Sequence, residues 1–101
     1  MAPSVRRTRQ ADEDIISIWL EIAQEDPAAA DRVLDAIERR CQQLAGFPYS
    51  GIARDDIAPG MRHLVAGHYL TLYRITDETV MTIRVLHGRR RIDAAMTEVP
   101  P

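Results

Sequence analysis

Residues 61–87, MRHLVAGHYLTLYRITDETVMTIRVLH, decide the fold because they contain three strand-like runs with only short breaks between them. Gly67-His68 and Asp77-Glu78 stand at those breaks and are typical of tight turns. Strands joined by turns this short must run antiparallel, so the stretch predicts a three-stranded meander. The predicted strands cover residues 61–67, 68–76 and 79–87.

Successive side chains of a strand point to opposite faces of its sheet. Along the last run this alternation predicts that Met81, Ile83 and Val85 share one apolar face, with Arg84 on the other. It also places His87 on the apolar face, at the point where the strand leaves the core.

Two amphipathic helices are predicted before the strands. Thr8 can cap the first helix, and Asp26 with Pro27 suits the start of the second, which ends near Gly46. The joint between them is short, so they form an antiparallel hairpin. Apolar residues recur at helical spacing at Ile15, Ile18, Trp19, Ile22 and Ala23 in the first helix, and at Ala30, Val33, Leu34, Ile37, Cys41 and Leu44 in the second.

The remaining segments complete a single domain over residues 1–101. Residues 3–8 predict a short opening strand, residues 47–60 a loop, and residues 91–97 a short last helix. The predicted order is β-α-α-β-β-β plus the C-terminal helix. This is an α+β fold, with the helical hairpin packed on a small antiparallel sheet.

Composition narrows the class of protein. The chain has 101 residues, of which 46% are hydrophobic and 28% charged, as in a globular domain. No apolar run approaches the roughly 20 residues needed to span a bilayer, and no apolar core follows the basic residues near the N-terminus. Cys41 is the single cysteine, so we expect a reducing, cytoplasmic location. His63, His68 and His87 lack metal-ligand spacing, so neither a metal nor a cofactor is expected.

Charge distribution argues against a large nucleic-acid footprint. All thirteen basic side chains are arginine, yet the formal net charge is −2 and the sequence pI is about 5.9. Proteins that work by gripping nucleic acid are usually basic over the whole domain. The basic excess is confined to Arg84, Arg89, Arg90 and Arg91, a stretch without an acidic residue.

Several stretches, taken in order and at their spacing, resemble one known family. They are ADEDIISIWLEIA, PYSGIAR, GMRHLVAGHYLTLYRI and TIRVLHGRR. Together, over roughly residues 5–93, they are similar to the ParE/RelE superfamily of toxins from bacterial type II toxin–antitoxin pairs. The strand ending RVLHGRR is more similar to the ParE branch. That family usually has an aspartate soon after the His-Gly pair, where this chain has Arg91, followed by Asp93.

The resemblance implies a RelE/ParE-like fold and two alternative activities. ParE-like members poison DNA gyrase, whereas RelE-like members are ribosome-dependent endonucleases that cut mRNA. Both kinds are neutralised by an antitoxin whose C-terminal segment wraps around the toxin. The N-terminal part of the antitoxin, a ribbon-helix-helix in ParD-like proteins, binds the operator, so the toxin would meet operator DNA only through it.

A ribonuclease needs a proton acceptor, a proton donor and cations at the phosphate. The candidates are Arg62, His87 and Arg90, but no lysine completes the cluster and the tail holds no tyrosine or histidine. His87 could instead be a strand-end histidine bonded to the backbone, and Arg62 could pair with Asp55 or Asp56. We therefore expect a protein that is not an enzyme.

Contact with other proteins is the favoured interpretation. Ile15, Ile16, Trp19 and Leu20 put bulky groups on more than one side of the first helix, so part of them should form an exposed antitoxin-binding patch. With Arg84 they are the predicted antitoxin-binding residues, and the alternative is that all the apolar ones are core. A further alternative is a non-toxic module that only binds its partner and co-represses the operon. The predicted gyrase-binding residues are Arg89, Arg90 and Arg91.

Overall fold

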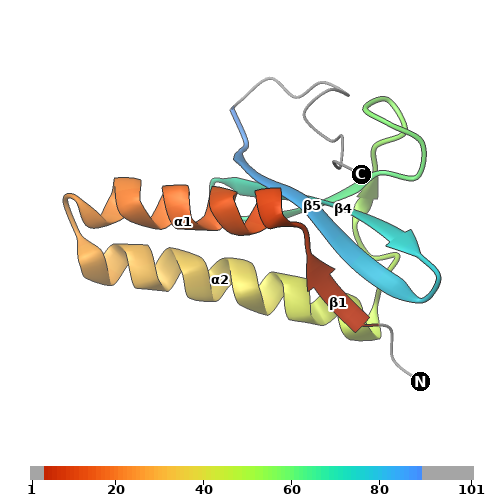
Figure 1. Cartoon of the computed structure of the whole chain (residues 1–101), viewed down its shortest axis with the longest axis horizontal. Coiled ribbons are helices and arrows are strands. Elements are labelled where there is room, and N and C mark those ends of the chain that lie inside the picture. Colours follow the sequence, from red (N-terminus) through yellow and green to blue (C-terminus); the bar gives the residue numbers. More distant parts are fainter. Residues whose placement is uncertain (1–3, 90–101) are drawn as a thin grey trace.

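The computed structural model describes residues 4–89, in which two helices pack against one face of a five-stranded sheet (Figure 1). This confirms the α+β fold and the order of its elements. The predicted helix at 91–97 lies outside the described residues. The elements are β1 (Ser4–Arg7), α1 (Arg9–Ala23), α2 (Pro27–Gly46), β2 (Ile52–Ala53), β3 (Arg62–Ala66), β4 (Tyr69–Thr76) and β5 (Thr79–His87).

The sheet has the order β1-β5-β4-β3-β2, and its centre is the predicted antiparallel meander of β3, β4 and β5. Asp77 and Glu78 at the β4–β5 turn have φ values of 47° and 61°, which is the left-handed backbone that a tight two-residue hairpin requires. The opening strand β1 is confirmed and lies parallel to β5. The segment 47–60 is not all loop, because β2 pairs with β3 within it.

Both helices begin where the sequence predicted. The Thr8 hydroxyl accepts from the Ala11 amide at 3.1 Å and donates to the Ile83 carbonyl at 2.9 Å, so the cap also fastens α1 to β5. The Asp26 carboxylate accepts from the Ala29 amide at 3.1 Å and starts α2. Figure 1 shows the two helices side by side as an antiparallel hairpin.

A β-bulge interrupts β5. Leu72 pairs with Arg84, but the next residue of β4, Tyr73, pairs with Thr82. Ile83 is therefore an extra residue opposite β4, and alternation of the side chains shifts at this point.

The bulge overturns the prediction that three apolar residues of the last strand share one face. Val85 packs with Ile18 and Ile37 beneath the helices. Met81 and Ile83 instead pack on the opposite face, with the cluster that includes Ile57 from the loop before β3. Strict alternation failed because an unpaired residue lies between the two groups.

The loop after α2 is fastened to the sheet by one tyrosine. The buried Tyr73 hydroxyl donates to the Pro48 carbonyl and accepts from the Gly51 amide, both at 2.9 Å. A Cβ at Gly51 would overlap the Tyr73 hydroxyl oxygen and lie 2.7 Å from the His63 carbonyl oxygen, so the close approach requires glycine. Neither α1 nor α2 is long and apolar enough to cross a membrane.

Candidate functional site

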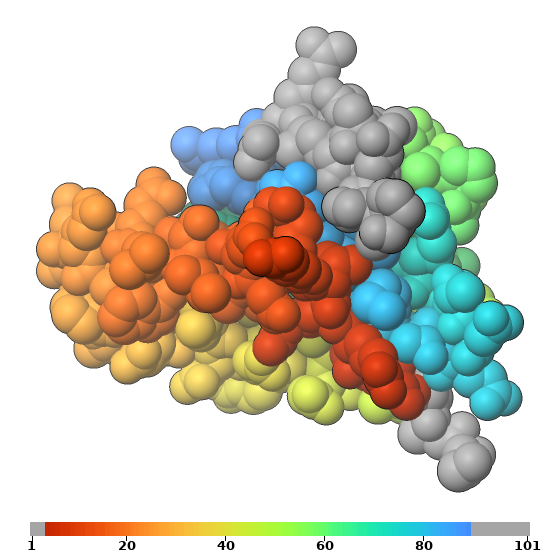
Figure 2. All heavy atoms as spheres, in the orientation of Figure 1, coloured from red at the N-terminus to blue at the C-terminus, as the bar shows by residue number. Residues whose placement is uncertain are grey.

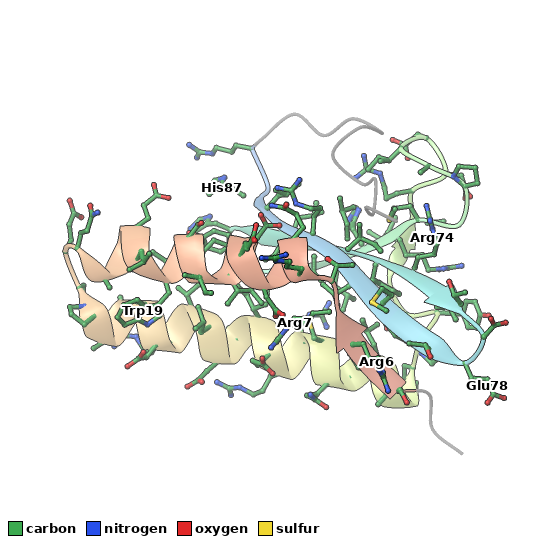
Figure 3. All side chains as sticks on the ribbon, in the orientation of Figure 1. Arg6, Arg7, Trp19, Arg74, Glu78 and His87 are labelled. Atoms are coloured by element: carbon green, nitrogen blue, oxygen red, sulfur yellow. The ribbon has the colours of Figure 1, made fainter. Side chains whose placement is uncertain are left out.

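His87 ends β5 as an exposed residue (Figure 3). Its Nδ1 accepts a hydrogen bond from the Arg89 amide at 3.1 Å. Its ring lies parallel to that of His68, at 6.1 Å between centroids, and meets the edge of Tyr69 at 5.5 Å. The geometry is that of a strand-end histidine bonded to the backbone.

Arg62 serves the loop rather than an open site. Its Nη1 donates to the carbonyls of Gly51 at 2.8 Å and Tyr49 at 3.2 Å. Its guanidinium also lies 5.1 Å from the centroid of the Tyr49 ring, a cation–π distance. Arg62 therefore holds the chain between α2 and β2 in place.

The expected ion pair of Arg62 with Asp55 or Asp56 is wrong. Asp56 pairs with Arg54 at 3.0 Å, and this hydrogen bond lowers the pKa of Asp56. Asp55 accepts from the Gly60 amide at 2.9 Å and so closes its own loop. Arg54, which is only two residues from Asp56 in the chain, forms the ion pair that was expected for Arg62.

The candidate nuclease residues are not brought together. Arg62 stands opposite Tyr73 on β4, and His87 stands opposite Tyr69. These two tyrosines are four residues apart on β4, which is about 13 Å along the strand. Arg62 lies on β3 and His87 on β5, and these two strands are ~10 Å apart because β4 lies between them. The backbones of Arg62 and His87 are therefore separated by roughly 16 Å. Arg90, the third candidate, lies outside the described residues.

Arg84 was expected on the surface and instead forms an interior ion pair with Asp14 of α1. Arg84 Nε lies 2.7 Å from Asp14 Oδ2 and Nη2 lies 3.0 Å from Oδ1, while the two side chains are only 12% and 10% exposed. The Val85 amide also donates to Asp14 Oδ2 at 3.0 Å. The hydrogen bond to Asp14 raises the pKa of Arg84, which burial alone would lower. Arg84 joins α1 to β5 and presents little of its side chain to a partner.

The predicted apolar residues of α1 divide between core and surface. Ile15 packs against the inner cluster, and Trp19 turns toward α2, where its Nε1 donates to Asp31 at 2.9 Å (Figure 3). Ile16 and Leu20 are 58% and 54% exposed and lie one helical turn apart on the same side. We call these two the α1 patch. The interpretation that all these residues are core is wrong, because α1 lies at the molecular surface (Figure 2).

Beside α1, a cavity of about 280 Å³ separates the helix from the end of β5. Ser17 and Glu21 of α1 line one side, and Tyr69 and His87 line the other. Burial, and then the negative charge of Glu21, raise the pKa of Tyr69. The cavity therefore has polar side chains of α1 on one side and the end of β5 on the other.

Sequence reasoning missed Asp14. The stripe predicted for the first helix did not include it, yet it is buried with Ala11 and Ile18. These three residues recur at helical spacing, so the inner stripe could have been extended to Asp14. Its partner, seventy positions later, could not be read from local pattern.

Comparison with known proteins identifies the family. Residues 5–92 match the family model of the ParE toxin of the type II toxin–antitoxin system parDE. The chain belongs to the ParE toxin family. Toxin ParE3 of Caulobacter vibrioides is 30% identical over 93 residues, covering 91% of this chain and 93% of that protein. Toxin ParE1 of Mycobacterium tuberculosis is 38% identical over 65 residues, or 63% and 66% of the two chains.

Solved structures agree with the ParE-family fold. A chain of the chromosomal ParDE toxin–antitoxin system from P. aeruginosa superposes with a TM-score of 0.74 at 20% identity, covering 85% of this chain and 96% of that one. A chain of the RelBE2 toxin–antitoxin complex from M. tuberculosis gives 0.55 at 27% identity, covering 86% and 99%. The first likeness concerns fold alone. The second shows that a chain of the RelBE2 complex shares much of this architecture.

Proposed function

We propose that this ParE-family toxin acts by poisoning DNA gyrase through contact, without an enzymatic step of its own. The observation that carries the proposal is the ParE-family match over residues 5–92, which includes the basic run Arg89–Arg91. Arg89 is exposed and follows the end of β5 after Gly88, while Arg90 and Arg91 lie outside the described residues. The basic run stands out on a chain whose net charge is −2. Such a local positive charge favours contact with an acidic surface or with DNA bound to the target.

Arg62 and His87 already form hydrogen bonds within the toxin, which supports a toxin that acts by binding its target rather than by catalysis. Arg62 donates to two carbonyls of its own chain, and His87 Nδ1 accepts a backbone amide. A general base must reach the proton it removes, and the cations must converge on one phosphate. Arg62 and His87, whose backbones lie roughly 16 Å apart, each bond to their own chain instead.

The experiment is a supercoiling and DNA-cleavage assay with purified gyrase and micromolar toxin. The proposal expects inhibited supercoiling and trapped double-strand breaks. The triple variant Arg89→Ala, Arg90→Ala, Arg91→Ala should lose most of this effect. A charge-matched control, Arg9→Ala, Arg32→Ala, Arg39→Ala, changes three exposed helical arginines and should keep it. Active gyrase at saturating wild-type toxin would overturn the proposal.

A RelE-like ribonuclease is the second candidate, favoured by the likeness to the RelBE2 chain. It predicts cut mRNA in a translating extract and loss of cutting in the double variant His87→Ala, Arg90→Ala. Intact mRNA at toxin concentrations that stop growth would dismiss this candidate.

We also propose that a ParD-like antitoxin, with a ribbon-helix-helix N-terminus, neutralises the toxin in the cytoplasm. The named ParDE and RelBE2 systems pair a toxin with an antitoxin, and the α1 patch gives an apolar helix a surface to cover. Co-expression with the product of the adjacent small gene should yield a stable complex and restore growth. Normal growth after induction of the toxin alone would favour the non-toxic co-repressor instead.

A further inference from the structure

Three residues form a straight row across the sheet face that points away from the helices. Arg6 of β1 pairs with Met81 of β5, and Met81 pairs with Arg74 of β4. Residues directly opposite each other in neighbouring strands share a face. Met81 packs with the cluster on the face opposite the helices, so both arginines flank it there.

Among the described residues, 4–89, neither Arg6 nor Arg74 of this row has an ion-pair partner. The Nε of Arg74 is buried and donates to no acceptor among those residues. Two like charges held on either side of one residue repel each other, and a buried donor without an acceptor is unfavourable. An anion placed between the two arginines would offset their repulsion.

The row lies in a cavity of about 460 Å³, which we call the sheet hollow. Met81 and Ile83 supply its apolar lining, while Asp77 stands at the β4–β5 turn. Figure 3 labels Arg6 on β1 and Arg74 on β4, the two strands that flank β5. The hollow therefore combines two cations with an apolar surface.

We propose that the sheet hollow is a docking site for an acidic segment of a protein partner. A carboxylate of that segment lies between Arg6 and Arg74, and a neighbouring apolar side chain covers Met81 and Ile83. Charged hydrogen bonds from two arginines hold the carboxylate, and the apolar contact adds affinity. This surface is separate from the α1 patch, because it lies on the sheet face away from the helices.

A nucleic acid fits the sheet hollow less well. Nucleic-acid sites usually gather many basic groups, because each phosphate contact contributes to binding. Here the lining offers two arginines together with the apolar side chains of Met81 and Ile83. A peptide that offers one carboxylate beside one apolar side chain matches this mixture.

The test measures binding of the full-length toxin to a fluorescein-labelled peptide in which Leu-Glu pairs alternate with Ser-Gly. The same peptide with glutamine for glutamate, and a short single-stranded DNA, are the comparison probes. The acidic peptide should bind tightest of the three. The double variant Arg6→Gln, Arg74→Gln should weaken that binding about ten-fold or more, because two charge-assisted contacts are lost.

Arg39→Gln is the matched control, since it removes an exposed arginine of α2, and it should leave peptide binding unchanged. Thermal unfolding of each variant checks that the fold is retained. If the double variant does not fold, Met81→Glu provides the test, because it places a carboxylate between the arginines and should abolish peptide binding. Equal binding of the glutamine peptide, stronger binding of DNA, or undiminished binding by a folded variant would overturn the proposal.

Discussion

Asp14 and Arg84 join the first helix to the last strand through a pair that local sequence does not reveal. The Asp14 carboxylate accepts from Arg84 and from the Val85 amide, and both charged side chains are almost enclosed. A buried charge is tolerated only with its partner, so each residue depends on the other. The pair also fixes α1, and with it the α1 patch, against the sheet.

Asp14→Ala should therefore be strongly destabilising. The substitution removes a nearly enclosed ion pair and the acceptor of the Val85 amide, and the loss of one member of a buried pair costs about 3–5 kcal/mol. Glu13→Ala, which removes only an exposed pair with Arg9 at 3.6 Å, should cost less than about 1 kcal/mol. Adding Arg84→Met to Asp14→Ala should recover much of the loss. Urea unfolding measures all three, and equal midpoints for Asp14→Ala and Glu13→Ala would contradict this role.

Cys41 provides a second prediction for a single residue. Burial raises the pKa of its thiol, so little of the reactive thiolate exists near neutral pH in the folded protein. Modification by a disulfide reagent at pH 8 should be slow in the native state and fast in denaturant. Ser17→Cys in a Cys41→Ala background, with an exposed thiol, is the fast-reacting control. Equal native rates for the two thiols would disprove the assignment.

Individual elements show how far sequence could predict this fold. The caps Thr8 and Asp26 and the turn at 77–78 were predictable, because each depends on residues close in the chain. The bulge at Ile83 was not, because it arises from pairing between two strands. Strand β2 was missed since it is only two residues long and exists through β3. The candidate site shows the same difference between local and long-range features. The exposure of Leu20 follows from the helical spacing of α1, whereas the burial of Arg84 depends on Asp14, seventy residues away in the chain.

The loop that carries β2 depends on close packing at Gly51. Gly51→Ala should cost about 1–3 kcal/mol, because the new methyl group overlaps Tyr73 and the backbone of His63. Gly46→Ala is the matched control. No atom would lie within 4 Å of its Cβ, so it should be neutral or stabilise the end of α2 by up to about 1 kcal/mol. Thermal unfolding separates them, and similar shifts for both would contradict the packing account.

At the scale of the whole molecule, distinct surfaces are available for different partners. The α1 patch lies on the outer side of the helical hairpin, and the sheet hollow lies on the face away from it. Arg89 follows the end of β5. Because these surfaces are separate, an antitoxin could dissociate from the α1 patch without changing the basic run proposed to bind the target.

The double variant Ile16→Glu, Leu20→Glu should separate neutralisation from toxicity. Two charges on the α1 patch oppose burial beneath an antitoxin helix, while the exposed positions leave the fold intact. Growth arrest should therefore persist even when the antitoxin is co-expressed. Ile52→Glu, at a 63% exposed residue outside α1, should still be neutralised. Full rescue of the double variant by the antitoxin would show that neutralisation does not need this patch.

The most direct test of the central claim is to count covalent gyrase–DNA complexes in cells after induction of the toxin without its antitoxin. Poisoning by contact predicts that these complexes accumulate with growth arrest in the wild type and in His87→Ala. It also predicts that they fail to accumulate when Arg89, Arg90 and Arg91 are replaced by alanine. Growth arrest with no such complexes would contradict the account.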